Sequence, residues 1–213
     1  MLKAVIFDMD GVVINSEPVS YRADKELFRQ LELDVPDAVY ASFVGTAPHN
    51  NMQKLKELYD ISLTQAALLD KRYKVYFDVF DKATDLELMP GVLEFISELR
   101  QKGIKVLLAT SAIKAKIERV FKRFNLDSYF DAVISGEDFE FSKPHPAIFL
   151  EAVNRTGYNK NECIIIEDST NGIAAAKAAG VYCVAYESPH GLPQDTGAAD
   201  KIITDFRELI SMF

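Results

Sequence analysis

The sequence predicts an α/β fold, a doubly wound parallel sheet with an α-helical domain inserted after its first strand. Two observations support this prediction. From residue 88 onward, short apolar runs alternate with amphipathic stretches of helical period, and the connections between them are short. This alternation is typical of a parallel sheet that helices cover on both faces, with right-handed crossovers. Residues 15–85, in contrast, contain helical patterns only.

The predicted strands are apolar runs of strand length. In chain order they cover residues 4–7, 104–109, 130–134, 163–166, 181–185 and 202–203. Nearly every position in them is apolar, which indicates strands buried on both faces of a sheet. The helices expected between them cover residues 92–99, 113–124, 144–156 and 169–179. Gly157 and Gly180 follow the last two of these helices, where a glycine commonly ends a helix.

Three further helical patterns fill the inserted segment. The third carries aromatic and apolar residues at helical spacing, which predicts the face of that helix that packs in the core of the insertion. These residues are Leu69, Tyr73, Tyr76, Phe77 and Phe80. We therefore predict two domains, a Rossmann-like core of residues 1–14 and 86–213 and a helical cap of residues 15–85.

Charge and composition indicate a cytoplasmic protein. The chain has 24 Lys and Arg residues against 32 Asp and Glu residues, a net charge of −8, which disfavours nucleic acid and anionic membranes as partners. The longest apolar run, residues 178–186, is shorter than the roughly 20 residues that a membrane span needs. Cys163 and Cys183 lie in apolar runs, where packed thiols are expected. The oligomeric state is left open, and a monomer is compatible with the sequence.

Four acidic residues follow two of the predicted strands. Asp8 and Asp10 come after the first strand, and Glu167 and Asp168 follow residues 163–166. Ligands of such sheets bind at the carboxyl ends of the strands, so we expect the four carboxylates on one rim. They repel one another and need compensating charge. One Mg²⁺, which prefers oxygen ligands, and Lys143 bring three positive charges, and a protonated Asp10 would bring the local sum to zero.

Thr110, Ser111 and Lys143 are the candidate phosphate-binding residues. Thr110 and Ser111 follow the second predicted strand just before a helix, where a hydroxyl and free N–H groups suit a phosphate oxygen. A simple helix cap explains this pair equally well. Lys143 precedes Pro144, which disfavours helical backbone at Lys143 and suits the first turn of a helix. We therefore expect Lys143 at the entrance of the helix over residues 144–156, near the same rim.

The basic residues of the predicted helix over residues 113–124 flank its apolar stripe. We expect them to form a solvated face rather than part of the site. They are Lys114, Lys116, Arg119, Lys122 and Arg123.

The motifs at the strand ends resemble those of the haloacid dehalogenase superfamily. The resemblance rests on four segments in the family's order: Asp8-Met9-Asp10-Gly11-Val12, Thr110, Ser142-Lys143-Pro144 and Glu167-Asp168-Ser169. The helical insertion directly after the first motif is similar to that of the β-phosphoglucomutase-like branch, which carries a cap of type 1. Asn15-Ser16-Glu17-Pro18 also resembles the segment by which that branch enters its cap.

The resemblance implies a phosphoryl-transfer enzyme that works through an aspartyl-phosphate. In it, Asp8 would be the nucleophile and Asp10 the general acid and base. The oxygens of the transferring group would be held by Thr110, Lys143 and the backbone amides near Met9, Asp10 and Ser111. The implied cofactor is Mg²⁺, bound by Asp8, the Asp10 carbonyl and Asp168, with Glu167 a direct or an indirect ligand.

The departures from the branch favour a phosphatase that acts on a small phosphorylated metabolite, with a sugar phosphate expected. Mutases of this branch carry a histidine near the cap entrance and an arginine after a cap glycine, whereas the matching positions here are Ser20 and Pro48. Thr46 and His49 are expected to face the substrate, and a turn before the next helix with Asn51 as its cap explains their segment equally well. The mutase remains the alternative, because His49 or a cap lysine could replace the arginine. A catalytically idle binding module is the less favoured third possibility. Dehalogenases of the superfamily lack the metal and the second acid of the first motif, so Asp10 disfavours that activity.

Overall fold

The computed structural model describes residues 1–43, 47–188 and 193–213. The chain divides into two compact units. One comprises Met1–Asn15 and Leu88–Phe213 and contains the sheet, and the other is the helical segment Ser16–Glu87. In the part of the chain that the structure describes, no helix has the length and apolar character needed to cross a membrane.

The sheet has six parallel strands in the order β3-β2-β1-β4-β5-β6. Their bounds are β1 (Ala4–Phe7), β2 (Lys105–Thr110), β3 (Ala132–Ser135), β4 (Cys163–Glu167), β5 (Tyr182–Tyr186) and β6 (Lys201–Ile203). The chain builds outward from β1 to β3 on one side and from β4 to β6 on the other. The predicted doubly wound sheet is therefore confirmed, and its strand order reverses beside β1, where ligands bind in such sheets.

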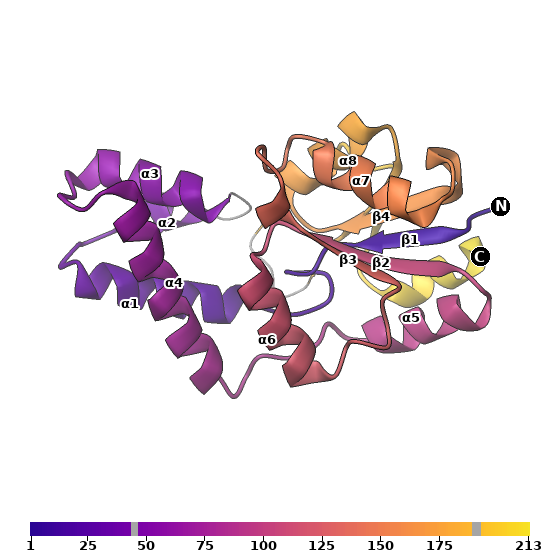
Figure 1. Cartoon of the computed structure of the whole chain (residues 1–213), viewed down its shortest axis with the longest axis horizontal. Coiled ribbons are helices and arrows are strands. Elements are labelled where there is room, and N and C mark those ends of the chain that lie inside the picture. The colour runs from indigo at the N-terminus through magenta and orange to yellow at the C-terminus, as the bar shows by residue number, and fades with distance from the viewer. Residues whose placement is uncertain (44–46, 189–192) are drawn as a thin grey trace. The chain divides into compact units, whose positions relative to one another are not determined.

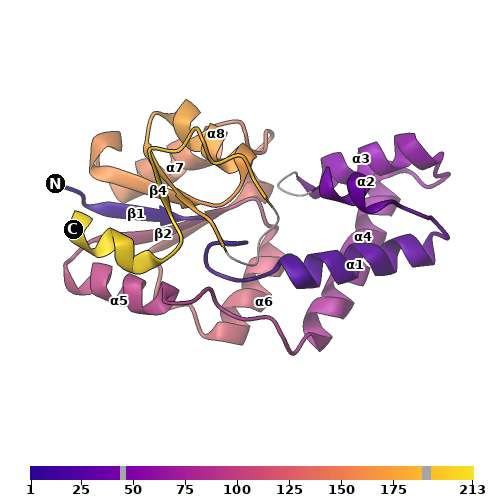
Figure 2. The ribbon, with the colours of Figure 1, turned by 180° about the vertical axis from the view of Figure 1, so that it is seen from behind.

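Helices cover both faces of the sheet (Figures 1 and 2). One face carries α7 (Ala147–Thr156) and α8 (Thr170–Ala179), and the other carries α5 (Val92–Gln101), α6 (Lys114–Phe124) and the 3₁₀ helix η3 (Phe206–Met212). Two further 3₁₀ turns, η1 (Gly136–Asp138) and η2 (Lys160–Glu162), lie in the connections. Neighbouring residues of a strand point to opposite faces. Ile6 accordingly joins the core under α7 and α8, whereas Phe7 contacts the rings of Phe95 and Phe206.

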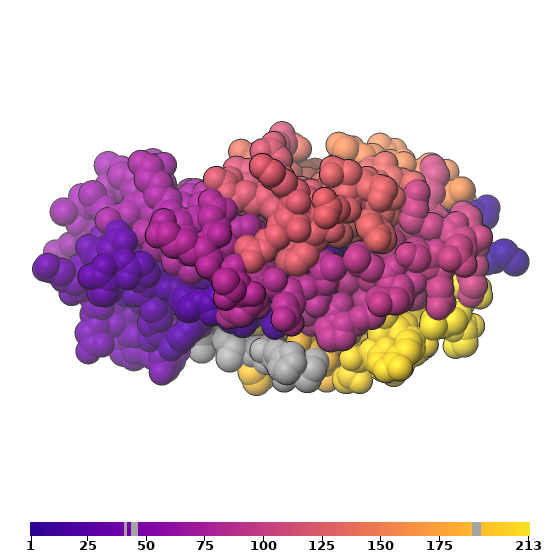
Figure 3. All heavy atoms as spheres, turned by 90° about the horizontal axis from the view of Figure 1, so that it is seen from below, coloured from indigo at the N-terminus to yellow at the C-terminus, as the bar shows by residue number. Residues whose placement is uncertain are grey.

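Aromatic rings fill the core on the Phe7 side of the sheet. Tyr186 stacks on Phe206 with ring centroids 4.6 Å apart, and Phe206 stacks in turn on Phe95 at 5.6 Å. Figure 3 shows the C-terminal segment, in yellow, beside the magenta atoms of α5. These ring pairs attach the C-terminal end to the sheet, since burial of each aromatic side chain removes a large apolar area from water.

The helical unit contains α1 (Glu17–Gln30), α2 (Asp37–Ala41), α3 (Pro48–Tyr59) and α4 (Gln65–Lys82). Its apolar core includes Leu27 and Phe28 of α1, Met52 and Leu55 of α3 and Leu68 of α4. The Thr64 hydroxyl oxygen begins α4 by accepting a hydrogen bond from the Ala67 N–H at 3.2 Å.

The prediction for the packed face of α4 is partly wrong. Tyr76 and Phe80 are buried as expected, but Leu69, Tyr73 and Phe77 are only partly buried. Leu68, Arg72 and Val75 are buried as well. A long-range ion pair accommodates Arg72 among these buried residues: Arg72 Nε donates to Asp24 Oδ1 of α1 at 3.0 Å, and both side chains are buried.

Replacement of Arg72 should destabilise the helical unit more than loss of any exposed charge on the same helix. Arg72→Met leaves the buried Asp24 carboxylate without its partner, and we expect the free energy of unfolding to fall by about 3–5 kcal/mol. The matched control is Lys74→Met, which breaks an exposed pair with Asp70 on the same helix and should change little. Urea unfolding measures both. Equal stability of the two variants would contradict the buried-pair explanation, and Asp24→Leu added to Arg72→Met should recover part of the loss.

Candidate active site

The side chain of Lys143 lies at the centre of the site. Its Nζ donates to Asp8 Oδ1 at 2.5 Å, to the Ala109 carbonyl at 3.3 Å and to Glu167 Oε1 at 2.7 Å. The lysine thus contacts residues of β2 and β4 and the residue that follows β1. Burial alone would lower the pKa of Lys143, but the carboxylates of Asp8 and Glu167 raise it above its usual value. Lys143 therefore stays charged.

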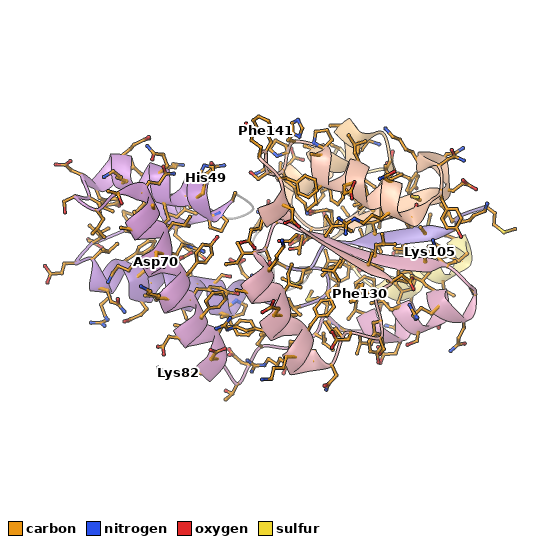
Figure 4. All side chains as sticks on the ribbon, viewed as in Figure 1. His49, Asp70, Lys82, Lys105, Phe130 and Phe141 are labelled. Atoms are coloured by element: carbon orange, nitrogen blue, oxygen red, sulfur yellow. The ribbon has the colours of Figure 1, made fainter. Side chains whose placement is uncertain are left out.

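Lys143 reaches this position from a turn rather than from a helix entrance. The prediction of a helix from residue 144 is wrong at its start, since α7 begins at Ala147. The His145 N–H donates to the Ser142 carbonyl at 3.0 Å and closes a turn around Lys143 and Pro144, whose shared peptide bond is cis. Phe141, just before this turn, is 56% exposed (Figure 4). The centroid of its ring lies 5.1 Å from that of the His145 ring.

Asp8 follows β1 and is nearly buried. Its backbone N–H donates to the Ile166 carbonyl at 2.9 Å, so the register between β1 and β4 continues to this residue. Burial raises the pKa of the Asp8 carboxyl to about 7; Lys143 opposes this shift, and the negative charges of Glu167 and Asp10 add to it. Besides Lys143, the Asp8 carboxylate therefore needs a second nearby cation, or a proton, to balance the negative charges of Glu167 and Asp10.

Asp10 lies two residues further on and has a different environment. Its side chain is 35% exposed, and its Oδ1 accepts from Lys116 Nζ at 2.7 Å. The Lys116 side chain is only 14% exposed. The prediction that Lys116 belongs to a solvated face is therefore wrong, and sequence reasoning missed a residue of the site. Its position offered a signal, because the first turn of a helix that follows a strand lies at the carboxyl edge of the sheet.

Glu167 is the last residue of β4, and protein donors occupy both of its carboxylate oxygens. Oε1 accepts from Lys143, whereas Oε2 accepts from the Asp168 N–H, the Ser169 N–H and the Ser169 hydroxyl at 2.8–3.0 Å. The residue is 1% exposed. Glu167 packs so closely on α8 that a Cβ added to Gly172 would lie 1.7 Å from Oε1.

Asp168 packs against the loop that carries Asp8 and Asp10. A Cβ added to Gly11, whose φ is +77°, would lie 1.9 Å from Asp168 Oδ2. Burial raises the pKa of Asp168 well above its usual value, and the negative charges of Glu167, Asp8 and Asp10 raise it further. The structure therefore brings all four predicted acids to one edge of the sheet.

Thr110 ends β2 and is 1% exposed. Its hydroxyl oxygen accepts from the Ala112 N–H at 3.1 Å, and α6 begins later, at Lys114, so Thr110 is not the N-cap of that helix. The adjoining Ser111 is half-buried. Its backbone touches Gly136, where an added Cβ would lie 2.8 Å from the Ser111 Cα. These contacts fix the backbone at the end of β2.

The structure gives less support for substrate contacts by the other predicted binding residues, Met9, His49 and Thr46. The Met9 side chain is fully buried, and its carbonyl accepts from the N–H groups of Val13 and Ile14, so only its backbone N–H could meet a substrate. His49 is exposed in the first turn of α3 (Figure 4). Thr46 lies outside the described residues. The roles of His49 and Thr46 stay predictions.

The donor set fits Mg²⁺ better than a metal that needs a cage of side chains. Within residues 1–43, 47–188 and 193–213, no group of three or more His, Cys, Asp or Glu side chains could hold a metal ion by itself. Mg²⁺ commonly uses one or two carboxylates and keeps several waters. Asp8 and Asp168, both with a raised pKa in a negative field, match that requirement.

Comparison with known proteins identifies the family of the chain. Residues 5–186 match the model of haloacid dehalogenase-like hydrolases. The chain belongs to this family. The prediction of a haloacid dehalogenase-superfamily enzyme is therefore confirmed.

The relatives differ in how much of their length this chain spans. The chain is 34% identical over 189 residues to the chloroplastic protein Suppressor of quenching 1 of Arabidopsis thaliana. The aligned region covers 88% of this chain but only 18% of the Arabidopsis protein. It is 29% identical over 199 residues to hexitol phosphatase B of Escherichia coli K12, covering 87% and 84% of the two chains. The structure of CbbY from Rhodobacter sphaeroides in complex with phosphate has the same fold, with a TM-score of 0.86, 24% identity and coverage of 98% and 96%.

Gly172→Ala should disturb the site, although alanine normally favours a helix. The added methyl overlaps Glu167 Oε1, which must move away from Lys143, and we expect the free energy of unfolding to fall by about 1–3 kcal/mol. Gly197→Ala is the matched control, because among the described residues its Cβ would meet only the Asp195 side chain, at 3.3 Å. Thermal unfolding measures both variants. Unchanged stability of Gly172→Ala would show that Glu167 has room to move.

Proposed function

We propose that the chain is a phosphomonoester hydrolase that forms an aspartyl-phosphate on Asp8 and acts on a small phosphorylated metabolite. The main support is the buried Lys143 ammonium, which holds Asp8 and Glu167 beside two further acids at the switch point of the sheet. A fixed cation next to a nucleophile suits phosphoryl transfer, where catalysis depends mainly on positioning and charge stabilisation.

The reaction has two steps, and each balances at named atoms. In the first, an Asp8 carboxylate oxygen attacks phosphorus, the bond from phosphorus to the leaving oxygen breaks, and Asp10 gives that oxygen a proton. In the second, a water oxygen attacks the phosphorus, Asp10 takes the proton from the water, and the bond to Asp8 breaks. Asp8 is regenerated and inorganic phosphate leaves.

The phosphoryl oxygens are held by Thr110, Lys143 and backbone amides. Because the Thr110 oxygen accepts from Ala112, its own hydrogen remains to be donated to a phosphate oxygen. Lys143 adds the charge, and the N–H groups of Met9 and Ser111 complete the set that the family motif implies. Such donors stabilise charge where it develops in the transition state.

Mg²⁺ is the proposed cofactor, with Asp8, Asp168 and the Asp10 carbonyl as its protein ligands. When bound, it neutralises charge on the transferring group. Glu167 is assigned an indirect role, since both of its oxygens already accept protein hydrogen bonds. Lys116 adds a second lysine to the charge balance expected from the sequence, and in the first step Asp10 must carry the proton that it gives to the leaving oxygen.

A sugar or sugar-alcohol phosphate is the proposed substrate class. Support comes from the relation to hexitol phosphatase B and from Ser20 and Pro48, which stand where mutases of this branch carry a histidine and an arginine. An uncharged loop does not replace the bidentate grip of arginine on a second phosphate.

Asp8→Asn tests the nucleophile directly. We expect phosphate release from a panel of hexose and hexitol phosphates to fall about 10³-fold or more, because the amide does not form the acyl phosphate. The fold should be retained, since the amide has nearly the same shape. Asp70→Asn, an exposed acid of α4, is the control and should retain full activity. Wild-type activity should disappear with EDTA and return with Mg²⁺. Retained activity in a clean Asp8→Asn preparation, or undiminished activity after chelation, would overturn the mechanism.

The same assay separates a hydrolase from a mutase. With β-glucose 1-phosphate, we expect Mg²⁺-dependent release of inorganic phosphate and no stimulation by glucose 1,6-bisphosphate. Glucose 6-phosphate and free phosphate are followed together. Faster formation of glucose 6-phosphate, and only with the bisphosphate, would establish the mutase alternative instead.

A further inference from the structure

Lys116 is tied to Asp10 by the ion pair that the sequence did not predict. Its Nζ lies 2.7 Å from Asp10 Oδ1. Of the two side chains, the carboxylate is the more exposed, at 35% against 14% for the lysine. The lysine stem is therefore largely covered by protein, whereas part of the Asp10 side chain is open to solvent.

The backbone of Lys116 is fixed by contacts that do not involve Asp10. Glu137 Oε2 accepts from the Lys114 N–H at 2.9 Å, and the Lys116 N–H donates to the Ile113 carbonyl at 2.9 Å. The Lys114 ammonium pairs with Asp138 of η1 at 2.5 Å. The first turn of α6 is thus held to the segment that follows β3, and it presents Lys116 from a rigid element.

The backbone of Asp10 is fixed as well, by a tight turn after β1. The Gly11 N–H donates to the Ile14 carbonyl at 2.8 Å, and the Val13 N–H donates to the Met9 carbonyl at 2.9 Å. With both backbones held, the hydrogen bond from Lys116 restricts rotation of the Asp10 side chain.

We propose that Lys116 is a positioning residue, which orients the Asp10 carboxyl group for proton transfer with the leaving group. This inference rests on the proposed function, in which Asp10 is the general acid and base. With this role, a side chain of α6 takes part in catalysis, in addition to the backbone N–H groups between Thr110 and the start of the helix. A competing role, in which the Lys116 ammonium binds an anionic group of the substrate, fits less well because the lysine is the less exposed partner.

The test compares two substrates that differ in how much they need a general acid. The p-nitrophenolate of p-nitrophenyl phosphate leaves with little protonation, whereas the alkoxide of a hexitol phosphate needs a proton. The value of kcat/KM reports the steps up to the transfer of the phosphoryl group to Asp8. For Lys116→Met we expect kcat/KM on the hexitol phosphate to fall about 10- to 100-fold, and kcat/KM on p-nitrophenyl phosphate to change by less than about threefold.

Three further variants complete the design. Lys116→Arg keeps the charge and should restore most of the activity on the hexitol phosphate. Lys122→Met, at an exposed position in the last turn of the same helix, is the matched control, and its activity should equal that of the wild type. In an Asp10→Asn background, Lys116→Met should cause little further loss, because the two residues act as one unit.

Equal losses on both substrates, or losses that add fully to those of Asp10→Asn, would overturn the proposal. A rise in KM confined to substrates with a second anionic group, and independent of Asp10, would also overturn it and support the competing role. Failure of the proposed function appears elsewhere, as a wild type that releases no phosphate or as an active Asp8→Asn variant. Thermal unfolding of Lys116→Met and Lys122→Met checks that both variants are folded.

Discussion

The contact of one buried ammonium with two buried carboxylates determines the arrangement of the site. Lys143 is 8% exposed and binds Asp8 and Glu167, which come from the ends of neighbouring strands. Each of these charges is costly to bury alone, and together they satisfy one another's hydrogen bonds. The relative positions of Asp8 and Glu167 therefore depend on the lysine, and the lysine in turn depends on the turn that begins at Ser142.

Glu167 also links this group of charges to the start of α8. The Ser169 hydroxyl donates to Glu167 Oε2, while its oxygen accepts from the Gly172 N–H at 3.1 Å and caps the helix. The carboxylate thus lies at the N-terminal end of α8, where helix dipole and unpaired N–H groups favour negative charge. Gly172 leaves the space that the carboxylate fills. The acidic motif and the start of the helix are therefore one structural unit, which explains why a serine and a glycine accompany the two acids.

The sequence carries most of the information about the sheet but less about the side chains that pair across it. Strands buried on both faces are apolar throughout, and their ends place acids and hydroxyls at one edge by geometry alone. Lys116 and Arg72 were not predictable in this way. Both have long stems that pack on apolar surface while the charged end finds a distant partner. Their partners, Asp10 for Lys116 and Asp24 for Arg72, lie far away in the sequence. Local periodicity therefore assigns Lys116 to a solvated face and makes no prediction for Arg72.

In the proposed mechanism, the two aspartates of the first motif take different tasks although their side chains are identical. Asp8 is buried and paired with Lys143, whereas Asp10, two residues later, is partly exposed and paired with Lys116. A nucleophile must approach phosphorus from a fixed position, and burial between rigid strands provides that. A group that exchanges protons with an alcohol and then with water must reach solvent, and the exposure of Asp10 provides that. Environments that separate the properties of two carboxyl groups are a common basis for dividing catalytic roles. Here each environment is set by one lysine, one from the turn before α7 and one from the first turn of α6.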